Sequence, residues 1–133
     1  MKTIIILSAA ILVAGCTHNG GPQAQAAEAE ASLAAALSGR IAGAQQDCVD
    51  ARDLASNTSY VGGAILFRDR ANDVIWLSRP TTGGCSFLNS GRALKFTGPQ
   101  LCRNSVVTVV DPATGREVAS CGLGDFTPYR LAR

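Results

Sequence analysis

Four cysteines are the residues whose chemistry this sequence indicates most clearly. Cys48, Cys85, Cys102 and Cys121 are separated by 36, 16 and 18 residues. Structural zinc sites usually take their ligands in closely spaced pairs, and thiol redox catalysis favours a C-x-x-C pair with a lowered thiol pKa. Neither spacing occurs here. An even number of widely spaced cysteines in a small domain instead predicts two structural disulfide bonds.

The pairing of these cysteines is a separate prediction. Four cysteines allow three pairings, and we expect Cys85 to bond with Cys102 and Cys48 to bond with Cys121. The two bonds would close loops of about 18 and about 74 residues. If disulfides act by lowering the chain entropy of the unfolded state, these bonds would contribute on the order of 3 and 4.5 kcal/mol of stability.

Three carboxylates form the second group that could do chemistry. Asp47, Asp50 and Asp53 lie within seven residues, and at this spacing they would lie near one face of a helix, which allows a small hydrolase as a hypothesis. We favour a solvated acidic turn whose charge Arg52 balances. The single histidine, His18, lies far from this region, so the folded domain offers no imidazole for a Ser-His-Asp, Cys-His or histidine-built metal site. We therefore predict no catalytic residue, metal or cofactor.

The N-terminal residues indicate where the protein resides. Leu12 to Cys16 reads Leu-Val-Ala-Gly-Cys and ends a short aliphatic run. This pattern resembles the lipobox of bacterial lipoproteins, in which a peptidase cuts after Gly15 and Cys16 receives a diacylglycerol. The run from Ile4 to Val13 is far shorter than the roughly 20 apolar residues needed to cross a bilayer. An ordinary secretory signal with an unrelated cysteine is the alternative.

The resemblance to a lipobox implies a protein held in the cell envelope by its N-terminal lipid. Thr17 follows the cysteine in place of the aspartate that retains many such lipoproteins at the inner membrane of enteric bacteria. We therefore expect the periplasmic face of the outer membrane. Loss of residues 1–15 would leave 11 Lys and Arg against 10 Asp and Glu. A balance this close to neutral argues against nucleic-acid binding.

The chain divides into three parts that would position these residues. Residues 1–15 are the predicted signal peptide, residues 16–46 a tether and alanine-rich linker, and residues 47–133 one small domain. Within the linker, Leu33 and Leu37 recur at helical spacing, so we expect a marginal helix from about Gln25 to Leu37 that ends near Ser38-Gly39. Its apolar stripe is thin, which predicts a helix that spaces the domain from the membrane or packs weakly.

The domain itself is predicted to be all-β. Strand patterns without intervening helices predict an antiparallel barrel or sandwich. Both faces of the first hairpin are apolar, so each must be covered. The Asp-Pro-Ala-Thr-Gly run at 111–115 supplies a clear turn for the last hairpin. The predicted strands are 60–68 and 73–78 around a loop at 69–72, a short strand at 92–97, 105–110 and 116–122 around the turn, and a final edge strand at 125–131.

A second resemblance covers most of this domain, from about Asp47 to Tyr129. Cys48, the run Ile-Leu-Phe at 65–67, Cys85, Leu-Cys at 101–102 and above all the run Ser-Cys-Gly-Leu-Gly-Asp-Phe-Thr-Pro at 120–128 resemble an uncharacterised family of small exported proteobacterial proteins. The loop between Leu77 and Cys85 departs from the family pattern, which puts any shared surface there in doubt. The family has no assigned activity, so the resemblance implies only the cysteine framework and the compartment.

Three functions follow as hypotheses. We favour a non-catalytic envelope lipoprotein that binds or supports an envelope protein, since a tether gives reach and the domain lacks an imidazole. A periplasmic inhibitor, similar in size, lipidation and β-rich character to membrane-bound lysozyme inhibitors, is the first alternative, although the inhibitory motif of that family has no match here. A small hydrolase using Asp47, Asp50 or Asp53 is the second.

Overall fold

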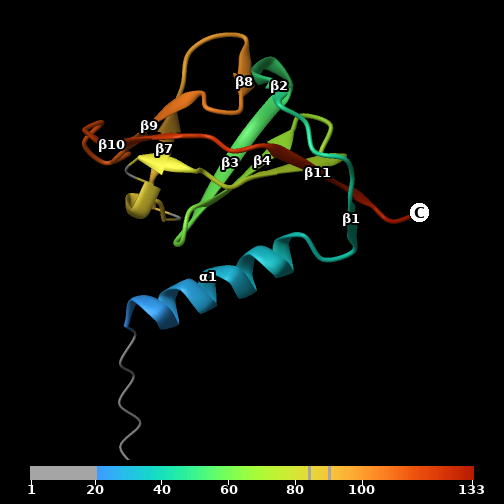
Figure 1. Cartoon of the computed structure of the whole chain (residues 1–133), viewed down its shortest axis with the longest axis horizontal. Helices are drawn as coiled ribbons and strands as arrows, with labels where there is room; N and C mark the ends of the chain where they lie inside the picture. Colours follow the sequence, from blue (N-terminus) through green and yellow to red (C-terminus); the bar gives the residue numbers. More distant parts are fainter. Residues whose placement is uncertain (1–20, 84, 90) are drawn as a thin grey trace, which may run out of the picture.

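The structure is a computed structural model that describes residues 21–83, 85–89 and 91–133. Within these residues one helix precedes a set of short strands (Figure 1). The elements in chain order are α1 (Pro22–Ala36), β1 (Arg40–Ala42), β2 (Cys48–Asp50), the 3-10 turn η1 (Ala51–Asp53), β3 (Leu54–Tyr60), β4 (Ala64–Asp69), β5 (Val74–Ser78), β6 (Thr82–Gly83), the 3-10 turn η2 (Cys85–Phe87), β7 (Ala93–Lys95), β8 (Gln100–Cys102), β9 (Val106–Val110), β10 (Glu117–Gly122) and β11 (Phe126–Leu131).

The strands form a sandwich-like domain of antiparallel sheets. One sheet has the order β1-β11-β5-β4-β3, and a second has the order β6-β10-β9-β7. A two-stranded ribbon of β2 and β8 lies beside them. The prediction of a small antiparallel all-β domain is confirmed, as a sandwich-like arrangement and not as a closed barrel.

The main core fills the space between the two sheets and the β2–β8 ribbon. Phe67 of β4 and Phe126 of β11 lie at its centre, with ring centroids 5.9 Å apart. This tilted arrangement suits the charge distribution of two aromatic rings. The other buried members come from both sheets, the ribbon and the adjoining turns: Val49, Leu54, Ile65, Leu88, Leu101, Val107, Val109, Cys121 and Leu123.

The other face of the five-stranded sheet is covered by α1 (Figure 1). Leu33 of the helix packs with four buried residues of β4 and β5, and the partly buried Ala36, Leu37, Tyr60 and Tyr129 surround this second cluster. The prediction that both faces of the β4–β5 hairpin are covered is therefore confirmed. The four sheet residues are Ala64, Leu66, Ile75 and Leu77.

The start and end of α1 follow from its terminal residues. Pro22 is the first helical residue, where its missing N–H costs nothing and its fixed φ suits the helix. The interior is rich in alanine, which loses no side-chain entropy on becoming helical. The turn after the helix brings Gly39 to a φ of 74°, a conformation that glycine adopts without strain. The predicted helix is confirmed and begins earlier than expected.

Two turns set the hairpins of the sandwich. In the β4–β5 loop, an Asp69 carboxylate oxygen accepts hydrogen bonds from the backbone N–H groups of Asp73 and Val74, at 2.8 and 3.2 Å. In the β9–β10 loop, the Asp111 carboxylate accepts from the N–H of Ala113 at 2.9 Å, and Gly115 takes a φ of 69°. Both hairpins occur where the turn residues predicted them.

Three features of the sheets differ from the predictions. Tyr60 ends β3 and residues 61–63 form a turn, so the predicted strand 60–68 is a strand only from Ala64, where β4 begins. β3 was not predicted, because its sequence is mostly Ser, Thr and Asn. β11 is not an edge strand, since β1 pairs along it on the side away from β5. β1 lies within 16–46, so residues of the predicted linker contribute to the sheet.

Two disulfides are present, but the predicted pairing is wrong. Cys48 bonds with Cys102, and Cys85 bonds with Cys121. The β2–β8 ribbon places Cys48 directly opposite Cys102, while Cys85 in η2 lies against β10, which carries Cys121. The long-range pairing of β2 with β8 therefore decides the partner of Cys102 and rules out the predicted bond between Cys85 and Cys102.

Candidate functional site

The segment from Gly122 to Pro128 forms one wall of the candidate site, a cavity described below. Gly124 fixes the path of this segment. The N–H of Gly124 donates to the Ser78 hydroxyl, which donates in turn to the carbonyl of Gly124, both at 3.1 Å. A Cβ at this position would overlap the backbone carbonyl of Arg79. Only glycine therefore fits between the segment and the end of β5. Leu123 and Phe126, both fully buried, fix the segment on either side.

A cavity of about 370 Å³ opens beside this wall. Its volume lies in the range of small-ligand sites. The cavity lies where the end of β5, the turn after β8 and the start of β11 come together. Two arginines, Arg79 and Arg103, line it together with one acidic residue, Asp125. The remaining residues that line it are Gln45, Leu77, Thr81, Gly124 and Thr127.

Arg79 is paired with a carboxylate from α1. Its two terminal nitrogens lie 2.9 and 3.2 Å from the two carboxylate oxygens of Glu30. The hydrogen bond and the charge of Arg79 lower the pKa of Glu30 below its ordinary value. Both side chains are about half exposed, at 52 % and 54 %. This bidentate pair connects the helix to the edge of the cavity.

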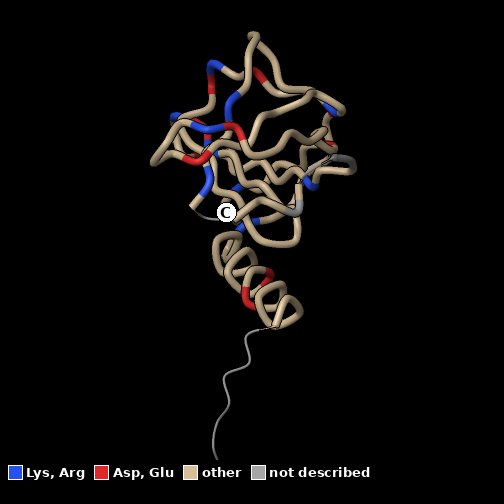
Figure 2. Tube along the Cα trace, turned by 90° about the vertical axis from the view of Figure 1, so that its left-hand side faces the viewer, with Lys and Arg blue, Asp and Glu red and all other residues tan. Residues whose placement is uncertain are grey.

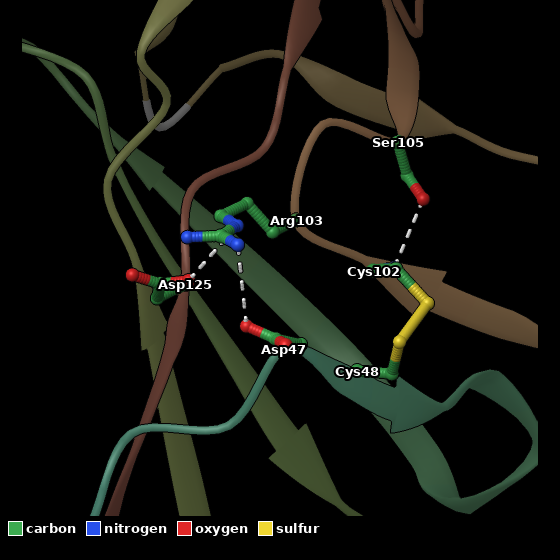
Figure 3. The surroundings of a disulfide bond; sticks show 6 residues. All are labelled: Asp47, Cys48, Cys102, Arg103, Ser105 and Asp125. Carbon is green, nitrogen blue, oxygen red and sulfur yellow. Dashed lines mark hydrogen bonds and ion pairs between the residues drawn. A yellow bond between two sulfur atoms is a disulfide. The ribbon is translucent and has the colours of Figure 1, made fainter.

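Arg103 lies between two carboxylates but is held more loosely (Figure 3). Its Nε is 3.5 Å from Asp125 Oδ1, and one terminal nitrogen is 3.8 Å from Asp47 Oδ1. These distances exceed those of charge-assisted hydrogen bonds, and the buried Asp125 Oδ1 has no hydrogen-bond partner among the described residues. The guanidinium is attracted to both acids while its N–H donors remain available.

The backbone around Arg103 is nevertheless fixed. The N–H of Arg103 donates to the carbonyl of Asp47 at 2.6 Å, and the N–H of Asn104 donates to the carbonyl of Leu123 at 2.8 Å. The Cys48–Cys102 disulfide joins the two residues next to Asp47 and Arg103 (Figure 3). The turn after β8 is therefore attached to both the ribbon and the wall that holds Asp125.

The three clustered aspartates do not converge. Asp47 lies near Arg103, whereas Asp50 accepts two side-chain hydrogen bonds from Arg52, at 2.7 and 3.0 Å. These bonds, with a backbone hydrogen bond from Arg52, lower the pKa of Asp50 to about 2. Asp53 lines a shallow depression with residues of the β4–β5 loop. The helical face that would have gathered them is absent, because β2 and η1 occupy this stretch.

The other predicted site residues divide between the core and the N-terminus. The four disulfide cysteines stabilise the sandwich, as described above. Gly15 and Cys16, the predicted cleavage and lipidation positions, lie outside the described residues. Within the described part of the chain, no group of three or more His, Cys, Asp or Glu side chains could hold a metal ion. In the same part, no helix has the length and apolar character needed to cross a bilayer.

The arginines of the cavity were not predicted from the sequence. Arg79 and Arg103 lie 24 positions apart, and neither stands in a recognisable motif. The one sequence signal near the site is the Gly-Leu-Gly-Asp run at 122–125, which forms the wall beside both arginines. Along the chain of the β domain, Lys and Arg positions are interspersed with Asp and Glu positions (Figure 2).

No protein family, no curated protein and no solved structure matches this chain.

Proposed function

We propose that this protein is a non-catalytic lipoprotein of the cell envelope, a binding module anchored through a lipid on Cys16. The observation that carries the binding role is the cavity of ligand size beside Gly124, which Arg79 and Arg103 both line. A lipid with more than one acyl chain would hold such a module stably at a membrane surface.

The distribution of the acidic residues supports a binding role over catalysis. General acid–base hydrolysis needs two carboxylates that reach one substrate bond. Asp47, Asp50 and Asp53 have three different surroundings, and each lies on an exposed or half-exposed part of the surface. The paired guanidinium groups are suited to hold an anion, and they are poor proton-transfer groups because arginine stays charged.

Cell fractionation of the full chain tests the anchor. Replacing Cys16 with Ser removes the thiol that would take the lipid, so we expect the C16S variant to move from the membrane fraction to the soluble periplasmic fraction. The matched control, Thr17→Ser, keeps the thiol and should stay with the membrane. Continued membrane association of the C16S variant would contradict the proposal.

The membrane in which the protein resides has its own test. In an enteric host, Thr17→Asp should move the protein from the outer to the inner membrane, if Thr17 is what permits export to the outer membrane. Density-gradient separation of the two membranes distinguishes these outcomes. An unaltered wild-type protein found in the inner membrane would refute the outer-membrane assignment while leaving the lipid anchor intact.

The lysozyme-inhibitor alternative calls for a different measurement. Purified full chain would be added to a lysis assay with lysozyme, over a range that includes a molar excess. Inhibition would make lysozyme the partner of the binding module. Undiminished lysis would remove this alternative.

A further inference from the structure

We propose that the cavity between Arg79 and Arg103 binds a carboxylate group of a peptide ligand. This inference deepens the proposed binding role, and its test does not depend on the lipid anchor.

The first step concerns the partner that Arg79 already has. Glu30 accepts two hydrogen bonds from it, one on each carboxylate oxygen, at 2.9 and 3.2 Å. Such bidentate pairing is how arginine recognises carboxylates most specifically. Glu30 belongs to α1 and does not line the cavity. A half-exposed pair of this kind contributes little stability. A ligand carboxylate can therefore exchange with Glu30 at small cost.

The second step concerns the unused donors of Arg103. Its contacts of 3.5 and 3.8 Å orient the guanidinium without forming close hydrogen bonds. The side chain is 53 % exposed, so solvent and ligand reach it. A carboxylate that enters beside Arg79 would meet this second cation within the same hollow.

Uncharged donors complete the site. The Gln45 side-chain amide donates to the Thr127 hydroxyl at 3.3 Å. This bond occupies an acceptor site of the hydroxyl and leaves its O–H able to donate to a ligand. Thr81, which directly precedes β6, lines the same cavity and is exposed. Two hydroxyls therefore accompany the two guanidinium groups.

The charge of the lining favours a carboxylate over a phosphate. Arg79 and Arg103 contribute two positive charges and Asp125 one negative charge to the lining, and Glu30 and Asp47 pair with the two arginines from outside it. A ligand carboxylate that displaces Glu30 replaces one negative charge with another and leaves the charge around the arginines unchanged. A phosphate group near neutral pH carries up to two negative charges, and it would leave an excess beside Asp125.

The occupant is expected to be a peptide because the cavity is small and one side is open. A volume of about 370 Å³ admits a carboxylate with a short stem, and the rest of a chain would extend outward. The carboxylate could come from a chain end or from an acidic side chain. The recognition chemistry is the same in both cases, so the probes must separate them.

The experiment titrates small probes into the full chain carrying Cys16→Ser and follows backbone amide signals by NMR. N-acetyl-alanine presents a chain-end carboxylate, and N-acetyl-glutamic acid α-amide presents a side-chain carboxylate. We expect at least one to cause saturable shifts at Gln45, Thr81, Asp125 and Thr127. N-acetyl-alanine amide lacks the charge and should cause none. The stronger of the two acids identifies the source of the carboxylate.

Three substitutions test the roles of the charges. Arg79→Gln and Arg103→Gln should each weaken carboxylate binding about tenfold, because each removes a charge-assisted pair. Arg116→Gln makes the same chemical change in the exposed β9–β10 loop and should leave affinity unchanged. Glu30→Gln should strengthen binding about two- to fivefold, since it frees Arg79 from its competitor.

Several results would overturn the inference. Equal shifts with N-acetyl-alanine amide would show that charge plays no part, and tighter binding of inorganic phosphate would refute the assignment to carboxylates. An equal loss with Arg116→Gln would reveal a general charge effect. Because the Cys16→Ser chain is used, failure here leaves the localisation test untouched, and a failed localisation test leaves this one valid.

Discussion

The two faces of the five-stranded sheet are covered in different ways. The inner face packs against the second sheet and the β2–β8 ribbon, with Phe67 and Phe126 at 1 % and 0 % exposure. The outer face is covered by α1, of which Leu33 is the one fully buried residue. Cross-strand pairing and two disulfides close the first face. Leu33, the partly buried Ala36 and Leu37, and one half-exposed ion pair hold the second.

The packing under the helix is also incomplete. A hollow of about 280 Å³ lies between α1 and the turn after β3. Ser59, which lines it, is 2 % exposed, and its hydroxyl has no hydrogen-bond partner in the described structure. Buried polar groups without partners and unfilled space both reduce stability. We therefore expect α1 to detach from the sheet at a lower free energy than that of global unfolding.

The largest expected effect tests the inner face. Phe67→Ala should lower the free energy of unfolding by about 3–5 kcal/mol, because it leaves a cavity beside Phe126 in the tightest part of the core. Chemical denaturation of the full chain carrying Cys16→Ser measures this loss. A loss below about 1 kcal/mol would show that the inter-sheet core is not the main source of stability.

The second effect concerns the disulfide of the β2–β8 ribbon. Replacing both Cys48 and Cys102 with Ala should lower the free energy of unfolding by about 2–4 kcal/mol. The other bond should remain, so a thiol assay of the unfolded variant should find no free Cys85 or Cys121. Two free thiols would mean that the bonds connect different residues.

The difference between local and long-range contacts explains what the sequence could and could not predict. Local signals were sufficient for α1, whose alanine-rich interior and Gly39 define it, and for the hairpin turns at Asp69 and Asp111. The helical face considered for Asp47, Asp50 and Asp53 is absent, because β2 consists of three residues and gains its strand structure only by pairing with β8. That pairing also decides the partner of Cys102.

The candidate site was out of reach of local patterns for a related reason. Arg79 follows β5 and Arg103 follows β8, and they line one cavity only because Gly124 packs against the end of β5 while the turn after β8 bonds to Leu123. Neither contact has a signature in the spacing of residues. One local pattern near the site was visible in the sequence, the Gly-Leu-Gly-Asp run at 122–125. Its second glycine, Gly124, is the residue that the close packing against Arg79 requires.

The third effect tests the outer face. Leu33→Ala should weaken the docking of α1 by about 2 kcal/mol, near the lower end of the range for buried leucines because the site is only partly packed. Hydrogen exchange should then accelerate in α1 far more than in β4 and β9. Ser32→Ala, at an exposed neighbour, should change exchange little. Equal acceleration in helix and sheets would mean that the two faces unfold together.

The smallest effect comes from the ion pair that closes the outer face. Arg79 lowers the pKa of Glu30 in the folded protein below its ordinary value of 4.5. The pair therefore stabilises helix docking fully above that ordinary value, and this contribution is lost as the pH falls through the lowered pKa. Because both side chains are half exposed, the loss should amount to about 0.2–1 kcal/mol.

Hydrogen exchange of α1, corrected for the intrinsic pH dependence of exchange, measures this contribution between pH 5.5 and about 3. Acidification should reduce protection in the wild-type helix. Glu30→Gln should start with the lower protection and show less change with pH, whereas Glu28→Gln, on the same helix, should behave as the wild type. If acid loosens the Glu30→Gln helix as much as the wild-type helix, the ion pair is not what holds it. The weak attachment of the outer face would then rest on the apolar contacts of Leu33, Ala36 and Leu37.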